Sequence, residues 1–199
     1  MRVIVQKATL RLAVRSLRWL CGAGAVVMLG YCEFGIADSW LYQKRETRRL
    51  EQLIAATPTP PKFVVPPVTG ALVGRIEIPR LGLSVVVGEG VDERTLRRAA
   101  GHIPGTGLPG QPGSIGISGH RDTFFRPLRN IRQDDIITLT TVAGNFRYRV
   151  VSTWIVSPSD VSVLDPGADE VLTLVTCYPF YFVGAAPERF VVRAIRVAQ

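Results

Sequence analysis

The sequence predicts a mainly β fold, a single small closed barrel or sandwich, preceded by an N-terminal membrane helix. Between residues 70 and 199, short alternating or β-branched apolar runs are broken by Gly and Pro, which is typical of strands joined by turns. Few stretches of this region have a helical pattern, so strands packed on strands are the simplest architecture. Upstream, a basic N-terminus leads into an apolar stretch long enough to cross a bilayer.

The first 37 residues have the charge distribution of a signal-anchor. Residues 1–18 carry five basic residues and no acidic one, which favours a cytoplasmic tail. Residues 19–37 are apolar apart from Glu33, and a helix of about 19 residues rises about 28 Å, close to the hydrocarbon core of about 30 Å. We therefore expect a single-pass transmembrane signal-anchor at 19–37, with the N-terminus cytoplasmic and the rest of the chain extracytoplasmic.

A cleaved secretory signal is the alternative for the same segment. Gly35 and Ala37 are spaced like a small-x-small cleavage site, so the mature chain would then begin at Asp38. Both alternatives export the downstream domain.

Residues 38–69 are expected to form an amphipathic and proline-rich linker. Apolar residues stand among charged ones from Trp40 to Ala56, which suits a short amphipathic helix at the membrane surface. The stretch 57–67 then holds five prolines, which favour an extended, semi-rigid spacer. The domain is therefore expected at 70–199.

Seven segments of the domain have strand patterns, so seven or eight strands are expected. They are 72–78, 83–87, 114–118, 136–141, 146–156, 171–176 and 190–197. Helical patterns are confined to 92–100, to residues around 124–131 and to a turn near 161–164.

The formal net charge of +8 argues for topology and against a nucleic-acid partner. Residues 1–18 contribute +5, whereas residues 70–199 balance 14 Arg against 12 acidic residues. No basic run interleaved with aromatic residues occurs in the domain, so no nucleic acid is expected as a partner. The chain also lacks the clustered His, Cys or Asp motifs of metal sites, and we expect neither a metal nor another cofactor.

Cys177 is the one cysteine of the exported part, because Cys21 and Cys32 lie in the apolar segment. It ends an apolar run and is followed by Tyr178 and Pro179, which places the thiol where a strand gives way to a turn. An unpaired exported thiol is either a nucleophile or an inert buried residue, and these alternatives are equally weighted before any motif is considered. A free thiol has a pKa of about 8.5, so a nucleophile would need a cation or an acid-base partner nearby.

Two histidines are available for that task. His120 follows an apolar strand and a glycine in Gly116-Ile-Ser-Gly-His-Arg-Asp, which is again a strand end. His102 stands between a helical pattern and a turn, where a hydrogen-bonded structural role is favoured, although it stays a candidate neighbour of the site.

Three blocks of the domain resemble sortases, most closely class D. They are Ile117-Ser-Gly-His-Arg-Asp-Thr-Phe-Phe-Arg-Pro-Leu, Thr173-Leu-Val-Thr-Cys-Tyr-Pro-Phe and Arg189-Phe-Val-Val-Arg. The resemblance covers about residues 70–199 and implies an eight-stranded sortase-type barrel outside the membrane. It also implies that Cys177 is the nucleophile, His120 the general acid and base, and Arg189 the group that stabilises substrate and oxyanion. Thr176, just before the cysteine, is a possible supporting residue.

The implied activity is transpeptidation. A sortase cleaves an LPxTG-like sorting signal between Thr and Gly through a thioacyl intermediate and transfers the acyl product to an amine. The implied partners are secreted proteins with a C-terminal sorting signal, an amine nucleophile of the cell envelope or a pilin, and the membrane. The alternative from another class is a noncatalytic, membrane-tethered barrel that binds peptide or envelope polymer. His120 precedes Cys177 by 57 positions, and this order and spacing argue against L,D-transpeptidases and papain-like enzymes.

Overall fold

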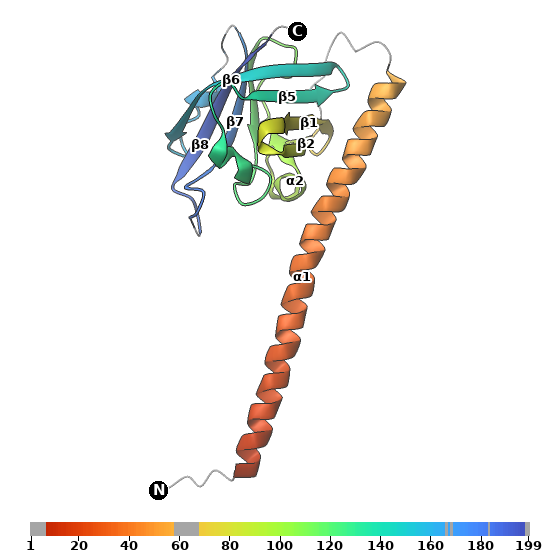
Figure 1. Cartoon of the computed structure of the whole chain (residues 1–199), viewed down its shortest axis with the longest axis vertical. Helices are drawn as coiled ribbons and strands as arrows, with labels where there is room; N and C mark the ends of the chain where they lie inside the picture. The colour runs from red at the N-terminus through yellow and green to blue at the C-terminus, as the bar shows by residue number, and fades with distance from the viewer. Residues whose placement is uncertain (1–6, 58–67, 166, 168, 183, 198–199) are drawn as a thin grey trace. The chain divides into compact units, whose positions relative to one another are not determined.

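The computed structural model describes residues 7–57, 68–165, 167, 169–182 and 184–197. By its contacts the chain divides into two compact units, Met1–Trp40 and Leu41–Gln199. One continuous helix, α1 (Lys7–Ala56), contains the apolar segment at 19–37 (Figure 1). Among the described residues, α1 is the one helix long and apolar enough to cross a membrane. The proline-rich spacer expected at 57–67 lies, apart from Thr57, outside the described residues.

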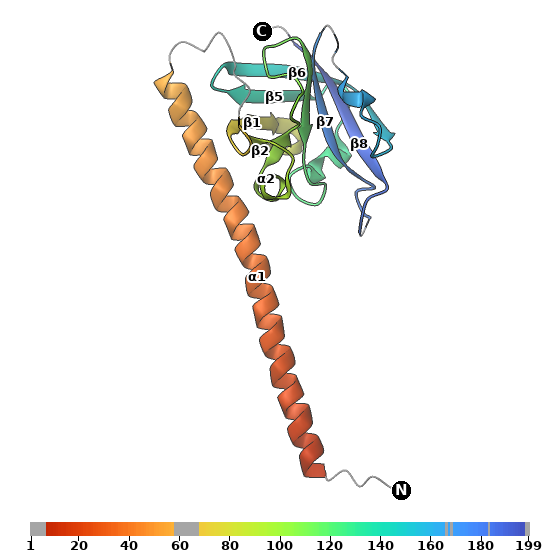
Figure 2. The same cartoon turned by 180° about the vertical axis from the view of Figure 1, so that it is seen from behind.

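The second unit contains a closed barrel of eight strands (Figures 1 and 2). The strands are β1 (Leu72–Ile78), β2 (Leu83–Glu89), β3 (Ala100–His102), β4 (Gly113–Ser118), β5 (Ile136–Thr141), β6 (Gly144–Val156), β7 (Glu170–Tyr178) and β8 (Glu188–Arg196). The helices between them are short, namely α2 (Glu93–Arg98) and the 3-10 turns η1 (Pro79–Leu81), η2 (Arg126–Asn130) and η3 (Ser162–Leu164). The mainly β, eight-stranded closed barrel with few helices is thus confirmed.

The strands do not follow one another around the barrel in chain order. The ring runs β1-β2-β3-β4-β7-β8-β6-β5 and closes through the pairing of β1 with β5. Two pairs are parallel, β2 with β3 and β4 with β7, and the others are antiparallel. The parallel pairing of β4 and β7 joins segments more than fifty residues apart, and it is the pairing that builds the site.

Burial follows the sequence pattern strand by strand. In β1, Ile76 and Ile78 are fully buried while the intervening Glu77 is not, as alternation requires. In β4 nearly every residue is buried. The Ile103 and Leu164 side chains lie close to the strand at Gly116, where an added Cβ would be 3.0 Å from each of them, so this strand is covered on both faces. The fully buried core includes Ile115, Ile117, Leu139, Tyr148, Leu172, Leu174 and Val192.

β3 is the strand that the sequence did not predict. The helical pattern expected over 92–100 ends at Arg98 in the structure, and Ala100 already belongs to β3. Asp92 starts the helix by accepting hydrogen bonds from the backbone N–H groups of Arg94 (3.0 Å) and Thr95 (3.1 Å). Gly101 then allows a close approach of two segments, because a Cβ at that position would lie 2.2 Å from the Gly90 carbonyl oxygen.

The C-terminal end of α1 belongs to the same unit as the barrel and contacts it. The Gln43 side chain accepts a hydrogen bond from the Val86 backbone N–H (2.8 Å) and donates one to the Arg98 carbonyl oxygen (2.7 Å). Leu50, further along the helix, is only 2% exposed. Part of the segment expected as a linker therefore folds against the domain.

Candidate active site

The three residues singled out for catalysis lie at the same end of three neighbouring strands, which we call the strand edge. β4, β7 and β8 are adjacent in the barrel, where Figure 2 shows β7 beside β8. In the register, Ser118 pairs with Val175 and Cys177 pairs with Arg189. The Gly119 backbone N–H continues the ladder by donating to the Val175 carbonyl oxygen at 3.2 Å. His120, the next residue, is thereby brought to the level of Cys177.

These three side chains differ in exposure and in their present contacts. His120 is exposed, whereas Cys177 and Arg189 are half-buried, so the thiol is neither buried in the core nor fully solvated. The Arg189 guanidinium donates to two backbone carbonyl oxygens just before it in the chain, those of Ala186 (3.2 Å) and Glu188 (3.0 Å). Both bonds start at Nη1, and a guanidinium has five N–H donors, so Nε and Nη2 can donate to a substrate while these bonds stay in place.

Thr176 supports the histidine segment and faces away from solvent. Its side chain is 2% exposed, and its hydroxyl donates to the Gly119 carbonyl oxygen at 2.7 Å. The Phe125 backbone N–H in turn donates to the His120 carbonyl oxygen at 3.0 Å. Thr176, predicted as a supporting residue, therefore contacts the backbone beside His120.

His102 lies in a different, buried cluster. It is 2% exposed and pairs through Nδ1 with Glu89 Oε2 at 2.7 Å, the two residues being neighbours across β2 and β3. Its Nε2 lies 2.9 Å from the Gly107 carbonyl oxygen and 3.1 Å from the Thr106 hydroxyl. A carbonyl only accepts hydrogen bonds, so Nε2 carries a proton. Both ring nitrogens are thus occupied inside the fold, away from the edge that carries Cys177.

An aromatic cluster beside Cys177 was not singled out from the sequence. The rings of Tyr178, Phe180 and Phe190 contact one another with centroid separations of 5.3 to 6.3 Å. Tyr181 and Phe182 follow in the same loop and are exposed. The dense aromatic run just after the cysteine was the available signal, and Phe180 and Phe190 of this cluster pack against the core of the barrel.

The next residue that the sequence did not reveal is Arg121. Its side chain is only 6% exposed although it directly follows the exposed His120. The guanidinium bonds to backbone carbonyl oxygens of the loop that joins β7 to β8. Backbone acceptors leave no mark in a sequence, and surface arginines are the usual case, so no signal was available.

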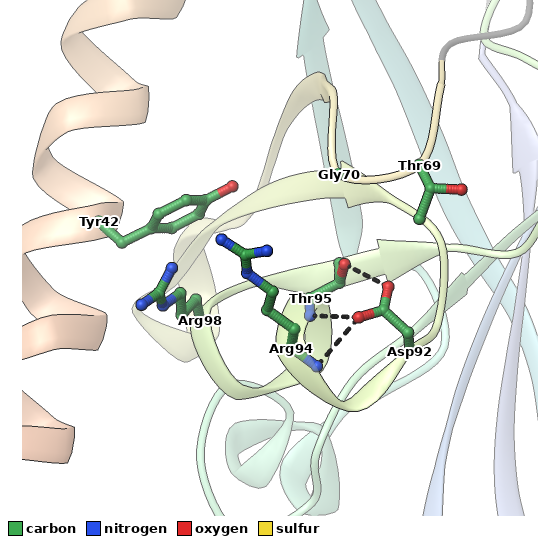
Figure 3. Close-up of a pocket in the computed structure, with 7 residues that line it drawn as sticks. All are labelled: Tyr42, Thr69, Gly70, Asp92, Arg94, Thr95 and Arg98. Atoms are coloured by element: carbon green, nitrogen blue, oxygen red, sulfur yellow. Dashed lines mark hydrogen bonds between the residues drawn. The ribbon is translucent and has the colours of Figure 1, made fainter.

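A polar pocket of about 410 Å³ lies elsewhere in the second unit (Figure 3). It is lined by Tyr42, Thr69, Gly70, Asp92, Arg94, Thr95 and Arg98. Burial raises the pKa of Tyr42 in this pocket, with the Glu46 carboxylate acting in the same direction. His120, Cys177 and Arg189 do not line it, so this pocket is separate from the strand edge. Among the described residues, no three His, Cys, Asp or Glu side chains gather closely enough to hold a metal ion.

Comparison with known proteins bears on the whole domain. The sortase domain family matches residues 76–197, which is more than half of the chain. Sortase D of Bacillus subtilis (strain 168) is 38% identical over 132 residues, covering 66% of this chain and 67% of that protein.

Solved structures show the same architecture. A sortase D5 transpeptidase from Clostridium perfringens superposes with a TM-score of 0.65 at 23% identity over 81% of this chain and 99% of that chain, a likeness of fold. Sortase C1 from Streptococcus agalactiae has a TM-score of 0.61 and 28% identity over 69% of this chain and 73% of that chain. The barrel, the three sequence blocks and the family match agree, and the chain belongs to the sortase family of transpeptidases.

Proposed function

We propose that the chain is a membrane-anchored cysteine transpeptidase in which Cys177 is the nucleophile, His120 the general acid and base, and Arg189 the oxyanion-stabilising residue. The observation that carries the proposal is the register of β4, β7 and β8, which brings these residues to one edge although His120 precedes Cys177 by 57 positions. A nucleophile with an acid-base residue and a fixed cation beside it is the equipment for acyl transfer.

The first half-reaction forms a thioester. The Cys177 thiolate adds to the carbonyl carbon of the scissile Thr–Gly bond, and the developing oxyanion is stabilised by the Arg189 guanidinium. His120, protonated, gives its proton to the glycine nitrogen as the C–N bond breaks, so the leaving group departs as a neutral amine. Arg189 keeps its charge throughout, which suits it to stabilisation and excludes it as a base.

The second half-reaction transfers the acyl group. An incoming amine adds to the thioester carbonyl, the now neutral His120 takes a proton from the attacking nitrogen, and the thiolate of Cys177 leaves. The product is a new amide bond. Water can replace the amine, which would make hydrolysis the side reaction.

The proposed substrates are secreted proteins that carry an LPxTG-like C-terminal sorting signal, and the acceptor is an amine of the cell envelope or of a pilin. A barrel on the outer side of the membrane would meet both the substrate proteins and the amine acceptor there. The apolar segment at 19–37 within α1 is consistent with an anchor that leaves the N-terminus in the cytoplasm. N-terminal sequencing of the mature protein tests this part, because a chain that begins at Asp38 would show that the segment is removed.

Thiol labelling and peptide cleavage test the chemistry. The full chain with Cys21→Ala and Cys32→Ala, purified in detergent, keeps Cys177 as its single thiol. We expect this form to cleave at least one peptide of a Leu-Pro-x-Thr-Gly and Leu-Ala-x-Thr-Gly panel and to lose cleavage when Cys177 is alkylated or replaced by Ala. If Cys177→Ala retains all activity, Cys177 is not the nucleophile and the proposed mechanism is wrong. If Cys177 reacts no faster than free cysteine and no peptide is cleaved, the noncatalytic binding barrel is the better description.

Arg189→Lys tests the role of the guanidinium. A lysine keeps the positive charge but replaces a planar fork of donors by a point charge, so we expect cleavage to fall by about 100-fold. Arg193→Lys, on the same strand but away from the strand edge, is the matched control. A near-wild-type rate for Arg189→Lys would remove Arg189 from the catalytic set.

A further inference from the structure

A buried cation stands directly beside the proposed acid-base residue. Arg121 follows His120 in the chain, and its side chain is 6% exposed whereas His120 is exposed. A charged side chain leaves water at a large cost unless its donors are paired. The hydrogen-bond partners of the Arg121 guanidinium therefore indicate why an arginine is buried at this position.

The guanidinium donors are used mainly by one loop. Nη1 donates to the Pro179 carbonyl oxygen at 2.8 Å, and Nη2 donates to the Phe182 carbonyl oxygen at 2.6 Å and more weakly to that of Gly184 at 3.4 Å. Nε donates to the neighbouring Asp122 carboxylate at 3.2 Å, a residue whose side chain is 71% exposed. The loop begins two residues after Cys177 and leads into the strand that starts beside Arg189.

Only an arginine side chain fits this arrangement. Its planar fork presents several N–H groups in fixed directions, so one side chain can bridge carbonyl groups at separated points of a loop. A lysine ammonium at the same place offers three donors from a single atom. The loop contains no described carboxylate that would account for the cation by charge alone. The directions of the guanidinium N–H groups therefore explain the arginine better than its charge does.

The contacts fix the backbone of His120 from both sides. On the N-terminal side, the Thr176 hydroxyl and the Val175 carbonyl hold Gly119 to β7. On the C-terminal side, Arg121 is tied to the loop that continues from β7. The imidazole of His120 is thus carried on a segment attached before and after to the chain that carries Cys177.

We propose that Arg121 is a positioning residue that sets the placement of His120 relative to Cys177 by docking the loop between β7 and β8. The proposal rests on the proposed cysteine transpeptidase function. Arg121 does not touch the reacting atoms, and it acts through the backbone of its neighbour and of the loop. Reacting groups displaced by about 1 Å lose on the order of 100-fold in rate, so the loss of this docking should be visible in turnover.

The test compares Arg121→Lys with a matched arginine outside the docking contacts. Arg126→Lys is the control, because Arg126 is exposed and lies in the same connection between β4 and β5. Both are made in the full chain with Cys177 as the single thiol, and folding is verified by near-ultraviolet circular dichroism. If Arg121→Lys does not fold, Arg121→Gln, which removes the charge and shortens the side chain, is measured in its place.

Two readouts separate positioning from general stability. For peptide cleavage we expect kcat to fall about 30-fold to 100-fold in Arg121→Lys with KM changed less than threefold, and both constants unchanged in Arg126→Lys. For alkylation of Cys177, which needs no substrate, we expect the pH profile of the rate to move toward that of His120→Ala. In the His120→Ala background, adding Arg121→Lys should change the alkylation rate less than twofold, because there is no imidazole left to place.

Several outcomes would overturn the proposal. One is a folded Arg121→Lys that cleaves within twofold of wild type. Another is a double variant, His120→Ala with Arg121→Lys, in which the rate losses of the two single variants multiply. That result would indicate a structural role of Arg121 independent of His120. Asp122→Asn should stay within twofold of wild type, and a loss equal to that of Arg121→Lys would assign the effect to Asp122 and not to the loop. Cleavage retained by Cys177→Ala would refute the proposed function itself, whereas an inactive Cys177→Ala beside a fully active Arg121→Lys refutes only the positioning role.

Discussion

The buried pair of Glu89 and His102 provides a sharp separation of structural from catalytic roles. Glu89 is 6% exposed, His102 is 2% exposed, and the carboxylate oxygen lies 2.7 Å from Nδ1. We predict that Glu89→Gln and Glu89→Ala destabilise the barrel while leaving the turnover of the folded enzyme within twofold of wild type. The reason is that both ring nitrogens of His102 are engaged inside the fold and none is directed to a substrate.

The contacts set the expected magnitudes. In Glu89→Gln the amide can still pair with the ring, its N–H donating to Nδ1 while Nε2 keeps the ring proton, so the change replaces a charge-assisted hydrogen bond by a neutral one, at about 1–2 kcal/mol of unfolding free energy. In Glu89→Ala the ring loses its acceptor in a buried site, and the cost rises to about 3–5 kcal/mol. Glu93→Gln is the control, because Glu93 is 85% exposed in its ion pair with Arg97 and is expected to cost less than about 0.5 kcal/mol.

Urea unfolding of the full chain in detergent, followed by near-ultraviolet circular dichroism, gives the free energies. Peptide cleavage is measured at a temperature where each variant is folded. Two results would refute the reasoning: a cost below about 1 kcal/mol for Glu89→Ala, or a tenfold loss of turnover in Glu89→Gln without loss of stability. The second result would return His102 to the active site as a working neighbour of Cys177.

Two further predictions concern the frame of the barrel. The hydrogen bond from Arg80 lowers the pKa of Asp135, so the pair stabilises the fold above the unfolded carboxyl pKa of about 3.9 and the stabilisation is lost as pH falls through the lower folded pKa. Urea unfolding from pH 5 down to about pH 3 should show this loss, and Asp135→Asn should flatten the pH dependence; an unchanged slope would contradict the assignment. Thr176→Val removes the hydroxyl that donates to the Gly119 carbonyl at nearly constant volume, and we expect about 1–2 kcal/mol lower stability and about tenfold lower kcat, whereas unchanged kinetics would show that this contact does not help to place His120.

The sequence was informative wherever a local pattern decides the structure. The alternation in β1 places Ile76 and Ile78 inside, and the expected boundaries at 72–78 agree with the strand. The position of Cys177 at the end of an apolar run, and of His120 after a glycine, was enough to expect both at strand ends. Their roles in catalysis remain proposals, although the register places them at one edge.

Long-range contacts account for what the sequence did not reveal. β3 has three residues, and its identity depends on pairing with β2 and on the close approach of Gly101 to the Gly90 backbone, neither of which is encoded locally. Arg121 donates to carbonyl groups about sixty residues away, and every residue type has a carbonyl. Contacts of this kind become visible only when the parallel pairing of β4 and β7 is known.

The closed ring of strands limits how a peptide can be held. Because each of the eight strands has neighbours on both sides, no described strand offers a full open edge to which an extended chain could add by backbone pairing. If the proposed function is right, we therefore expect recognition of the peptide to depend on side chains and on loop groups at the rim of the barrel. A substrate bound in that way is selected by the shape and chemistry of its side chains, and it can leave without dismantling a sheet.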